Sequence, residues 1–246
     1  MKKYAVIVAG GMGLRMGGSV PKQFMVLKER PVLWYTLDVF LRAFDDVRIV
    51  LVVPGGYREA AVEVINGLSG GERVLLVDGG DTRFHSVRSG LDYIKGELGG
   101  SEAGIGVGGG KGEIGEGVAR EAIIFVHDGV RCLVSAELIR RCYEQAVLVG
   151  SAVPVVDCRD SVRLVGEGEH SKPIDRSRIK MVQTPQTFRG DILFSAYMQD
   201  HQEAFTDEAT VVEVGGQAVH LIEGEATNIK ITTPEDMVIA EVLLRR

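Results

Sequence analysis

The sequence contains little cysteine and histidine and no long apolar segment. Three cysteines occur in 246 residues, an odd number without a CxxC pair, which argues against a disulfide framework. The five histidines show no HExxH-like spacing, which argues against a zinc site. No apolar run is long enough to cross a bilayer, and the N-terminus is predicted to begin as a strand, not as a signal segment. We therefore expect a protein of the reducing cytoplasm.

The sequence also lacks an excess of positive charge. Its net charge of −6 argues against a nucleic-acid or membrane partner, since both favour a basic protein surface. A local basic pocket is still compatible with this charge. Hydrophobic residues make up 45% and charged residues 25%, as in ordinary soluble proteins. A chain of 246 residues is long enough for one large α/β domain with a substantial core.

A glycine-rich loop follows directly after the first predicted strand, in the segment AVIVAGGMGLRMGGSVPKQ (residues 5–23). Glycine lets the backbone turn sharply and approach a ligand, and successive N–H groups in such a turn can hold an anion. An arginine fork and a lysine point charge both suit phosphate oxygens. The loop is therefore predicted to bind a triphosphate through Gly10, Gly11, Gly13, Arg15 and Lys22.

The spacing of this loop excludes two common phosphate-binding motifs. Lys22 lies between Pro21 and Gln23, whereas a P-loop requires glycine before the lysine and serine or threonine after it. Met16 stands where a dinucleotide-binding motif requires its third glycine. On the loop alone, a glycine-rich turn with two solvated cations stays open as the alternative.

Apolar segments of strand length alternate with segments of helical pattern along the chain. This alternation predicts an α/β fold, a mostly parallel sheet with helices on both faces. Ligands of such sheets bind beyond the carboxyl ends of the strands, so the glycine loop and His127-Asp128 are predicted to meet in one crevice. We expect strands at residues 4–8, 48–53, 73–77, 122–126 and 151–156, and helices at 31–44, 57–67, 82–95, 135–149, 189–200, 207–214 and 234–244.

The loop resembles the signature of nucleotidyltransferases that join a nucleoside triphosphate to a sugar or polyol phosphate. The chain is most similar to the 2-C-methyl-D-erythritol 4-phosphate cytidylyltransferase family of the non-mevalonate isoprenoid pathway. The resemblance implies a Rossmann-like nucleotidyltransferase fold and transfer of a cytidylyl group from CTP to that polyol phosphate, with release of pyrophosphate. Besides the loop, it rests on VVPGGYREA (52–60), DGGDTRFHSVRSGL (78–91), VHDGVRCLV (126–134), VQTPQTF (182–188), FTDEATVVEVGG (205–216) and EGEATNIKITTPEDMVIAE (223–241).

Such a transfer requires positive charge around the α-phosphate of CTP. A phosphate oxygen attacks the α-phosphorus while pyrophosphate departs, so catalysis depends on positioning and charge neutralisation. The resemblance implies that Arg15 and Lys22 are the catalytic cations. Asp128 is the expected ligand of Mg²⁺, which usually takes one or two carboxylates together with phosphate oxygens and water. The alternative for Asp128 is a carboxylate that merely ends a strand.

The resemblance also implies which residues bind the two substrates. The nucleotide is expected to contact Ala9, Gly10, Gly11, Gly13, Asp81, Ser86 and Lys230. The acceptor is expected to contact Arg131, Ser161, Arg176, Thr184, Thr206 and Asp207. For each of these the alternative is an ordinary structural or surface side chain, and Asp81-Thr82 could equally be the start of a helix.

Two segments depart from simple alternation within the single domain expected for residues 1–246. Glycine supplies 11 of the 22 residues between 96 and 117, which predicts a flexible surface insertion because glycine loses much entropy on ordering and has nothing to bury. Residues 157–180 are predicted to form a two-stranded arm, which would be barely stable alone. The resemblance implies that this arm embraces a second subunit in a twofold homodimer and delivers Arg176 to it.

The chain departs from the family at two motifs. Val8-Ala9-Gly10 stands where the family typically has PAAG, and HDGVRC (127–132) stands where it has HDAARP. These changes concern fine geometry and retain the cations and the acid named above. Two alternatives stay open, a cytidylyltransferase acting on ribitol or ribulose 5-phosphate and a nucleotide-binding protein without turnover.

Overall fold

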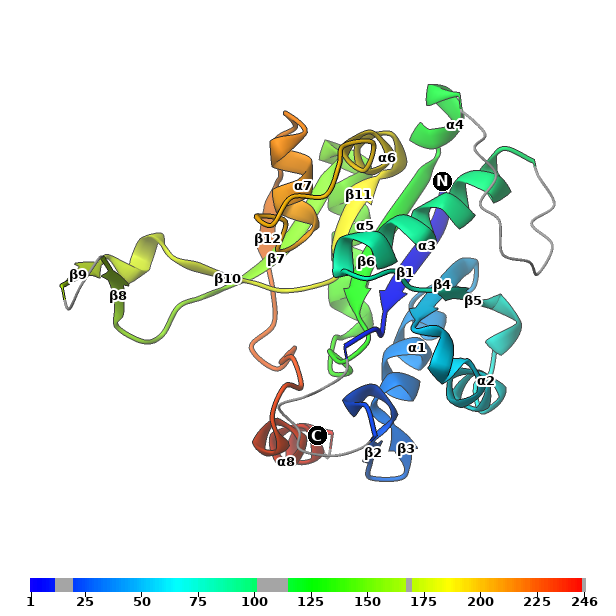
Figure 1. Cartoon of the computed structure of the whole chain (residues 1–246), viewed down its shortest axis with the longest axis horizontal. Helices are drawn as coiled ribbons and strands as arrows, with labels where there is room; N and C mark the ends of the chain where they lie inside the picture. Colours follow the sequence, from blue (N-terminus) through cyan, green and yellow to red (C-terminus); the bar gives the residue numbers. More distant parts are fainter. Residues whose placement is uncertain (12–19, 101–114, 167–169, 245–246) are drawn as a thin grey trace.

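An eight-stranded sheet forms the centre of the computed structural model, which describes residues 1–11, 20–100, 115–166 and 170–244 (Figure 1). Four parallel strands lie side by side in the order β6-β1-β4-β5. They are short runs rich in valine and isoleucine, as expected for strands covered on both faces. Their bounds are β1 (Lys2–Val8), β4 (Val47–Val53), β5 (Val74–Asp78) and β6 (Ala122–Asp128).

The other half of the sheet is mixed. β12 (Leu221–Glu223) is parallel to β7 (Ser151–Asp157), whereas β10 (Lys180–Val182) and β11 (Gln186–Arg189) are antiparallel to it. β11 also pairs antiparallel with β6 and so joins the two halves. The mostly parallel sheet predicted from the sequence is confirmed, and β11 adds an antiparallel strand to its middle.

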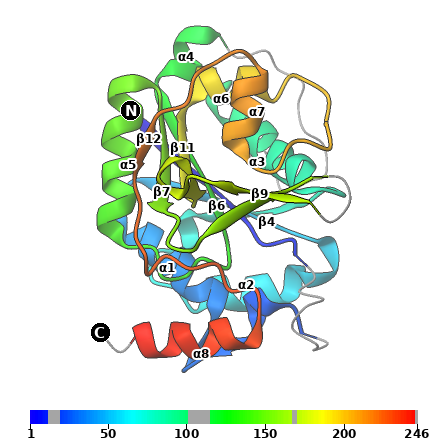
Figure 2. The same ribbon diagram turned by 90° about the vertical axis from the view of Figure 1, so that its left-hand side faces the viewer.

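Helices cover both faces of the sheet, as Figure 2 shows. Successive strand residues point to opposite faces. Ile7 of β1 therefore belongs to the core under α1 (Val32–Ala43) and α5 (Ala136–Val149), and its neighbour Val6 to the core under α3 (Arg83–Leu98). Apart from the elements of residues 157–180, described below, the remaining helices and strands of the described chain are short or peripheral. They are α2 (Arg58–Asn66), α4 (Glu116–Arg120), α6 (Gly190–Ala196), α7 (Glu208–Val214), α8 (Pro234–Leu243), the pair β2 (Val26–Leu27) and β3 (Arg30–Pro31), and 3-10 turns η2 (Lys22–Phe24), η3 (Gly55–Tyr57) and η4 (Gly71–Arg73).

The five strands and seven helices predicted from the sequence are all present. The largest difference in their ends is at α6, which stops at Ala196 and not at residue 200. Ser135 caps α5 by accepting from the Leu138 N–H at 2.9 Å, and Thr233 caps α8 in a capping box with Asp236. The predicted α/β class is confirmed.

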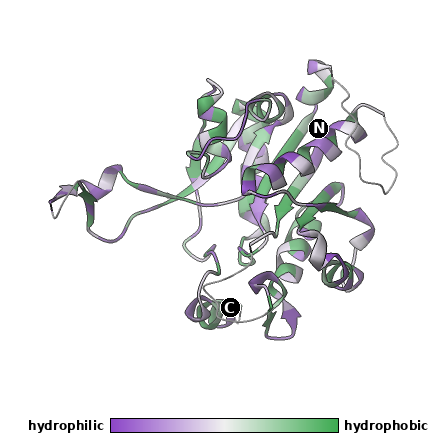
Figure 3. Ribbon diagram, viewed as in Figure 1, coloured by the Kyte–Doolittle hydropathy of each residue, from purple (hydrophilic) through white to green (hydrophobic). Residues whose placement is uncertain are grey.

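A hairpin projects from the sheet within residues 157–180, as predicted for the arm (Figure 1). Its strands β8 (Val162–Val165) and β9 (Ser171–Ile174) pair antiparallel. Leu164 and Val165 are 61% and 72% exposed, and Figure 3 shows hydrophobic residues among hydrophilic ones on this hairpin. An isolated two-stranded hairpin is only marginally stable in water, so contacts beyond the hairpin are expected to stabilise it.

The predicted glycine-rich insertion lies between two helices. α3 extends to Leu98 and α4 begins at Glu116, so both ends of the segment predicted as a loop at residues 96–117 are helical. Residues 101–114 lie outside the described residues. Within the ranges that the structure describes, no helix is both long and apolar enough to cross a membrane.

Candidate active site

The carboxyl ends of β1 and β6 meet at one edge of the sheet (Figure 1). Val8 at the end of β1 pairs with Asp128 at the end of β6, and the Gly129 N–H donates to the Val8 carbonyl at 2.9 Å. Ser86 of α3 lies beside them, because a Cβ on Gly10 would be 3.9 Å from Ser86 Oγ. The start of the glycine loop and the end of β6 therefore lie side by side, and this junction is the predicted crevice.

Asp128 is surrounded by three cationic side chains. Its Oδ1 lies 3.4 Å from both Nε and Nη2 of Arg83. Its Oδ2 lies 3.0 Å from Lys230 Nζ and 3.5 Å from Arg131 Nε. Burial alone would raise the pKa of Asp128, but the three cations together hold that pKa well below its usual value. Asp128 is therefore ionised at neutral pH.

Lys22 lies against the start of the glycine loop. It opens the turn η2, whose next residue, Gln23, donates from Nε2 to the Ala9 carbonyl at 2.7 Å. A Cβ on Gly11 would lie 3.9 Å from Lys22 Cε, and Lys22 is only 8% exposed. Gln23 thus ties this lysine to the end of β1. The rest of the loop, including the predicted Gly13 and Arg15, lies outside the described residues.

The first turns of α3 hold Ser86 at the crevice. Its hydroxyl accepts from the Gly80 N–H at 3.2 Å and donates to the Gly80 carbonyl at 3.3 Å. Thr82 caps the helix by accepting from the His85 N–H. The exposed Asp81 precedes this cap, so the helix start that competed with a binding role uses Thr82 and not the Asp81 carboxylate.

His127 and Thr184 join β6 to the loop before β11. Thr184 Oγ1 accepts from the Asp128 N–H at 3.1 Å and lies 2.9 Å from His127 Nδ1. His127 Nε2 lies 3.2 Å from the Arg131 carbonyl, which can only accept, so Nε2 carries the proton and the Thr184 hydroxyl donates to Nδ1. Complete burial lowers the pKa of His127 to about 3, so the ring is neutral. The hydroxyl of Thr184, predicted to bind the acceptor, is thus hydrogen-bonded to Asp128 and His127 within the protein.

Arg131 has a buried donor without a hydrogen-bond acceptor. Its Nη1 donates to the Asn228 carbonyl at 2.9 Å. Its Nε has no hydrogen-bond partner among the described residues, although Asp128 Oδ2 is 3.5 Å away. Buried donors are nearly always satisfied, so this N–H depends on the longer ion pair with Asp128.

The two predicted acceptor residues before α7 have different surroundings. Asp207 caps α7 by accepting from the N–H and hydroxyl of Thr210, and its other oxygen accepts from Gln186 Nε2 at 2.9 Å. Thr206 is exposed. The Asp207 side chain therefore has a structural role that its prediction as a substrate ligand did not include.

The two predicted acceptor residues on the arm lie apart from the crevice of their own chain. Ser161 precedes β8, and Arg176 begins the turn η5 (Arg176–Arg178), where its Nη1 donates to the Arg159 carbonyl at 2.8 Å. Figure 1 shows the arm projecting away from β6. Within one described chain, Ser161 and Arg176 therefore do not join Asp128.

Arg83 and Glu208 lie at the site but were not among the residues predicted from the sequence. Glu208 is fully buried in the first turn of α7, and its carboxylate binds two nitrogens of the Arg83 guanidinium, with Nη2 2.9 Å from Oε2 and Nη1 in contact with Oε1. Burial would lower the pKa of Arg83, but Glu208 and Asp128 raise it above its usual value. The pair is separated by 125 positions, so no local pattern joins it. The one local indication in the sequence was the position of Arg83, directly after the helix cap Thr82 and close to the crevice.

A divalent metal fits this site only together with phosphates. In the ranges that the structure describes, no three His, Cys, Asp or Glu side chains are grouped to hold a metal ion. Asp128 can supply one carboxylate. Mg²⁺ usually takes one or two carboxylates and completes its shell with phosphate oxygens and water. The donor set thus fits a metal that binds with a triphosphate.

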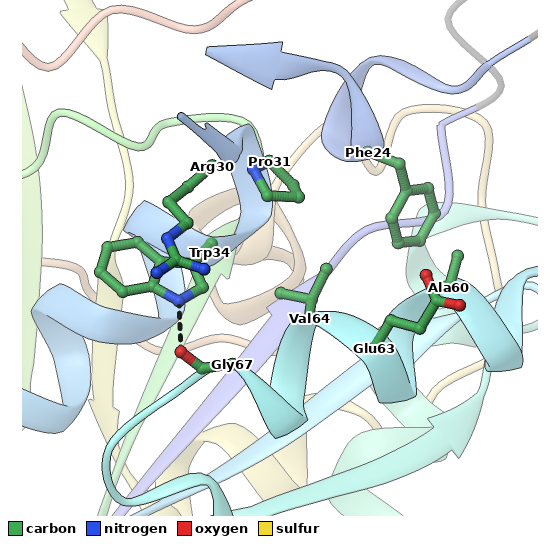
Figure 4. Close-up of a pocket in the computed structure, with 8 residues that line it drawn as sticks. All are labelled: Phe24, Arg30, Pro31, Trp34, Ala60, Glu63, Val64 and Gly67. Atoms are coloured by element: carbon green, nitrogen blue, oxygen red, sulfur yellow. Dashed lines mark hydrogen bonds between the residues drawn. The ribbon is translucent and has the colours of Figure 1, made fainter. Parts of the chain in front are cut away.

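A small hollow of about 170 Å³ lies beside η2, with Phe24 in its wall (Figure 4). The Arg30 guanidinium lies 5.4 Å from the centre of the Trp34 ring, and Trp34 Nε1 donates to the Gly67 carbonyl at 2.9 Å. None of its lining residues belongs to the set predicted to bind the substrates.

A sequence model of the family described as "IspD: 2-C-methyl-D-erythritol 4-phosphate cytidylyltransferase" matches residues 4–101 and 114–246. The chain belongs to this family. Membership identifies it as a CTP-dependent nucleotidyltransferase, and neither alternative from the sequence is favoured. The match omits residues 102–113, which fall within the predicted insertion.

Individual relatives agree along the whole chain. The chain is 40% identical over 245 residues to a 2-C-methyl-D-erythritol 4-phosphate cytidylyltransferase of Phocaeicola vulgatus, covering 99% of this chain and 100% of the relative. It is 41% identical over 244 residues to the enzyme of the same name from Bacteroides fragilis, with the same coverage. A crystal structure of a 4-diphosphocytidyl-2C-methyl-D-erythritol synthase superimposes with a TM-score of 0.76 at 28% identity, covering 99% of this chain and 98% of that one. The crystal structure of the 2-C-methyl-D-erythritol 4-phosphate cytidylyltransferase from Thermus thermophilus superimposes with a TM-score of 0.69 at 28% identity, with 98% of both chains covered.

Proposed function

We propose that the protein transfers the cytidylyl group of CTP to 2-C-methyl-D-erythritol 4-phosphate, giving CDP-methylerythritol and pyrophosphate in non-mevalonate isoprenoid biosynthesis. The observation that carries the proposal is the cluster of cations on Asp128 at the carboxyl ends of β1 and β6, with Lys22 beside the same loop. Such a cluster attracts ligands that carry several phosphates. Family membership supplies the identity of the two substrates.

The reaction forms one P–O bond and breaks another. A phosphate oxygen of the acceptor attacks the α-phosphorus of CTP, and the bond from that phosphorus to the bridging oxygen breaks as pyrophosphate leaves. Lys22 and Arg15 bind the oxygens on which negative charge increases. Mg²⁺, held by Asp128 and the phosphates, supplies further positive charge when it is bound.

Lys230 can exchange Asp128 for substrate phosphate, and Arg131 adds positive charge beside it. The Lys230 side chain is 42% exposed, so its ammonium can turn from Asp128 into the crevice at little cost. Arg131 stays beside Asp128, since its side chain is only 12% exposed and its Nη1 donates to the Asn228 carbonyl. Movement of Lys230 onto the substrates leaves Asp128 Oδ2 available to a metal.

The acceptor site is composite in this proposal. Thr184, Thr206 and Asp207 belong to the body of one subunit, and Ser161 and Arg176 come from the arm of the other in a twofold homodimer. Arg176 binds the phosphate of the acceptor across this interface. The exposed apolar residues of β8 support the dimer, because a partner would cover them.

Turnover with three acceptors tests the proposed function. Purified protein, CTP and Mg²⁺ are mixed with methylerythritol phosphate, ribitol 5-phosphate or ribulose 5-phosphate, and pyrophosphate is followed. We expect pyrophosphate with the first acceptor alone, and loss of most of the rate when UTP, ATP or GTP replaces CTP. Comparable turnover with ribitol or ribulose phosphate would assign the protein to that acceptor. Absence of turnover with all three acceptors would favour the alternative of a nucleotide-binding protein without turnover.

A further inference from the structure

Arg83 differs from the other two cations at Asp128 because it is bound by two carboxylates at once. Its Nε and Nη2 both lie 3.4 Å from Asp128 Oδ1, while Nη1 and Nη2 bind the two oxygens of Glu208. Lys230 reaches Asp128 from a side chain that is 42% exposed, whereas Glu208 is completely buried. Arg83 is 29% exposed but is held by both carboxylates, so Lys230 can reorient more readily than Arg83.

Glu208 is itself held in a fixed place. The Tyr197 hydroxyl donates to its Oε1 at 3.2 Å, and the Tyr197 ring stacks on Phe84, the neighbour of Arg83, with ring centres 4.7 Å apart. Gln186 of β11 fixes the start of α7, since its side-chain oxygen accepts from the Ala209 N–H at 2.7 Å. β11 pairs directly with β6, which carries Asp128. One rigid unit thus contains both carboxylates and the arginine between them.

The charge of this unit matters as much as its rigidity. The two negative charges of Glu208 and Asp128 more than balance the single positive charge of Arg83. A lone arginine beside Asp128 would repel an incoming cation and would be drawn to the triphosphate. Neutralised by Glu208, Arg83 can stay on Oδ1 while Lys230 turns to the phosphates, and Oδ2 then loses its 3.0 Å ion pair and can accept a metal.

We propose that Arg83 and Glu208 are positioning residues that fix Oδ1 of Asp128 and thereby present Oδ2 to the divalent metal. This inference rests on the proposed function, in which Asp128 binds that metal. Neither residue needs to touch a substrate. Partners of metal ligands commonly change metal affinity by about 10- to 100-fold, which sets the size of the effect to expect.

The test is the affinity for Mn²⁺, followed by electron paramagnetic resonance of the free ion, in the presence of CTP and the absence of acceptor. Glu208→Gln keeps the shape of the side chain but removes the charge that holds Arg83. We expect Mn²⁺ binding to weaken by about 10- to 100-fold and kcat to fall. We expect CTP affinity without metal, and KM for the acceptor, to stay near their original values.

Two further variants make this test specific. Tyr197→Phe removes only the hydrogen bond to Glu208 and should weaken Mn²⁺ binding by about 3- to 10-fold, the worth of one hydrogen bond. If melting experiments show that Glu208→Gln does not fold, the Mn²⁺ affinity of Tyr197→Phe tests the proposal in its place. Asp191→Asn is the matched control, because Asp191 is also a carboxylate paired with arginine, here with Arg120 and Arg189, but on α6. It should leave Mn²⁺ affinity unchanged.

Unchanged Mn²⁺ affinity in folded Glu208→Gln, or in Tyr197→Phe if the first variant unfolds, would overturn the proposal. A large loss of metal-free CTP affinity would also overturn it, since Arg83 would then be a phosphate ligand. Asp128→Asn separates this failure from that of the proposed function. If Asp128→Asn still binds Mn²⁺ as the original protein does, the metal role of Asp128 itself is wrong. If it loses Mn²⁺ while Glu208→Gln keeps it, only the positioning role is wrong.

Discussion

At the scale of single residues, the loop that carries Asp128 depends on a histidine that stays neutral. His127 Nδ1 accepts from the Thr184 hydroxyl and Nε2 donates to the Arg131 carbonyl, so both nitrogens are satisfied in one tautomer. A second ring proton would face the hydroxyl proton and would place a charge in the core. The pKa of about 3 follows from this burial.

We predict that the free energy of unfolding decreases as the pH is lowered from about 6.5 towards 4. The pKa of His127 is about 3 in the folded protein and 6.5 in the reference state, so in this range only the unfolded chain binds the proton. This contribution is fully present above pH 6.5 and falls by about 1.4 kcal/mol per pH unit below it. Urea unfolding at several pH values measures the slope. His127→Gln should make it shallower, and equal slopes in both proteins would contradict the argument.

The catalytic cations give a second prediction at this scale. Lys22→Ala and Arg15→Ala should each lower kcat by about 100-fold or more while changing KM far less, because a preorganised donor acts mainly on the charge of the transition state. Steady-state kinetics on folded variants measures both constants. Lys2→Ala, at the amino end of β1, removes the same charge far from the crevice and should have no effect. Near-normal kcat in Lys22→Ala would remove that residue from the mechanism.

Sequence position predicted some of the site residues and could not predict others. Asp128 directly ends an apolar strand and Lys22 closes the glycine loop, so their place after strands was enough to bring them to one edge. Arg83 and Glu208 meet only because α3 and α7 lie on the same face of the sheet. That packing depends on the order of the strands, which no local pattern encodes.

At the scale of elements, α3 approaches the sheet closely at one glycine. A Cβ on Gly90 would lie 2.8 Å from Val6 Cγ1 and 3.3 Å from Val52 Cγ2, and both valines are completely buried. Since α3 also carries Arg83 and Ser86, the depth at which it packs sets where these side chains enter the crevice.

We predict opposite effects for two glycines of this helix. Gly90→Ala gains about 1 kcal/mol of helix propensity but costs about 1–3 kcal/mol through overpacking, so it should destabilise the protein. Gly96→Ala is the matched control in α3, because its Cβ would meet nothing within 4 Å, and it should stabilise by up to about 1 kcal/mol. Urea unfolding compares them. Equal changes in both variants would mean that the contact with Val6 has no cost.

The elements that the sequence did not predict are short. β11 contributes four residues and β12 three, too few for a two-residue alternation to be recognised. Long β1, β4 and β6 were predicted because each is a continuous apolar run buried on both faces. The antiparallel position of β11 depends on its pairing with β6 and β7, which is a tertiary property.

At the scale of the whole molecule, the arm and the crevice belong together only if two chains associate. Arg176 lies on the projecting arm and Lys22 in the body. Arg176→Ala should raise KM for the polyol phosphate and leave CTP affinity largely unchanged, because it removes one phosphate contact of the acceptor.

Mixing two impaired variants tests the composite site. Arg176→Ala and Lys22→Ala proteins, combined under conditions that exchange subunits, should recover part of the activity, since one site of each mixed dimer contains both intact residues. Kinetics and a size measurement on the mixture check this. If mixed dimers form and no activity returns, Arg176 does not act across the interface.

The ends of the chain leave the fold on opposite sides of the sheet. Lys2 opens β1 at the amino ends of the parallel strands, where Figure 1 marks the N-terminus. α8 lies at the other edge, and just before it the Ile231 N–H donates to the carbonyl of Val130, two residues after Asp128. An affinity tag or a tether to a sensor surface is therefore best fused before residue 1. The same fusion after α8 would instead pull on the segment that is hydrogen-bonded to Val130, in the loop that follows Asp128.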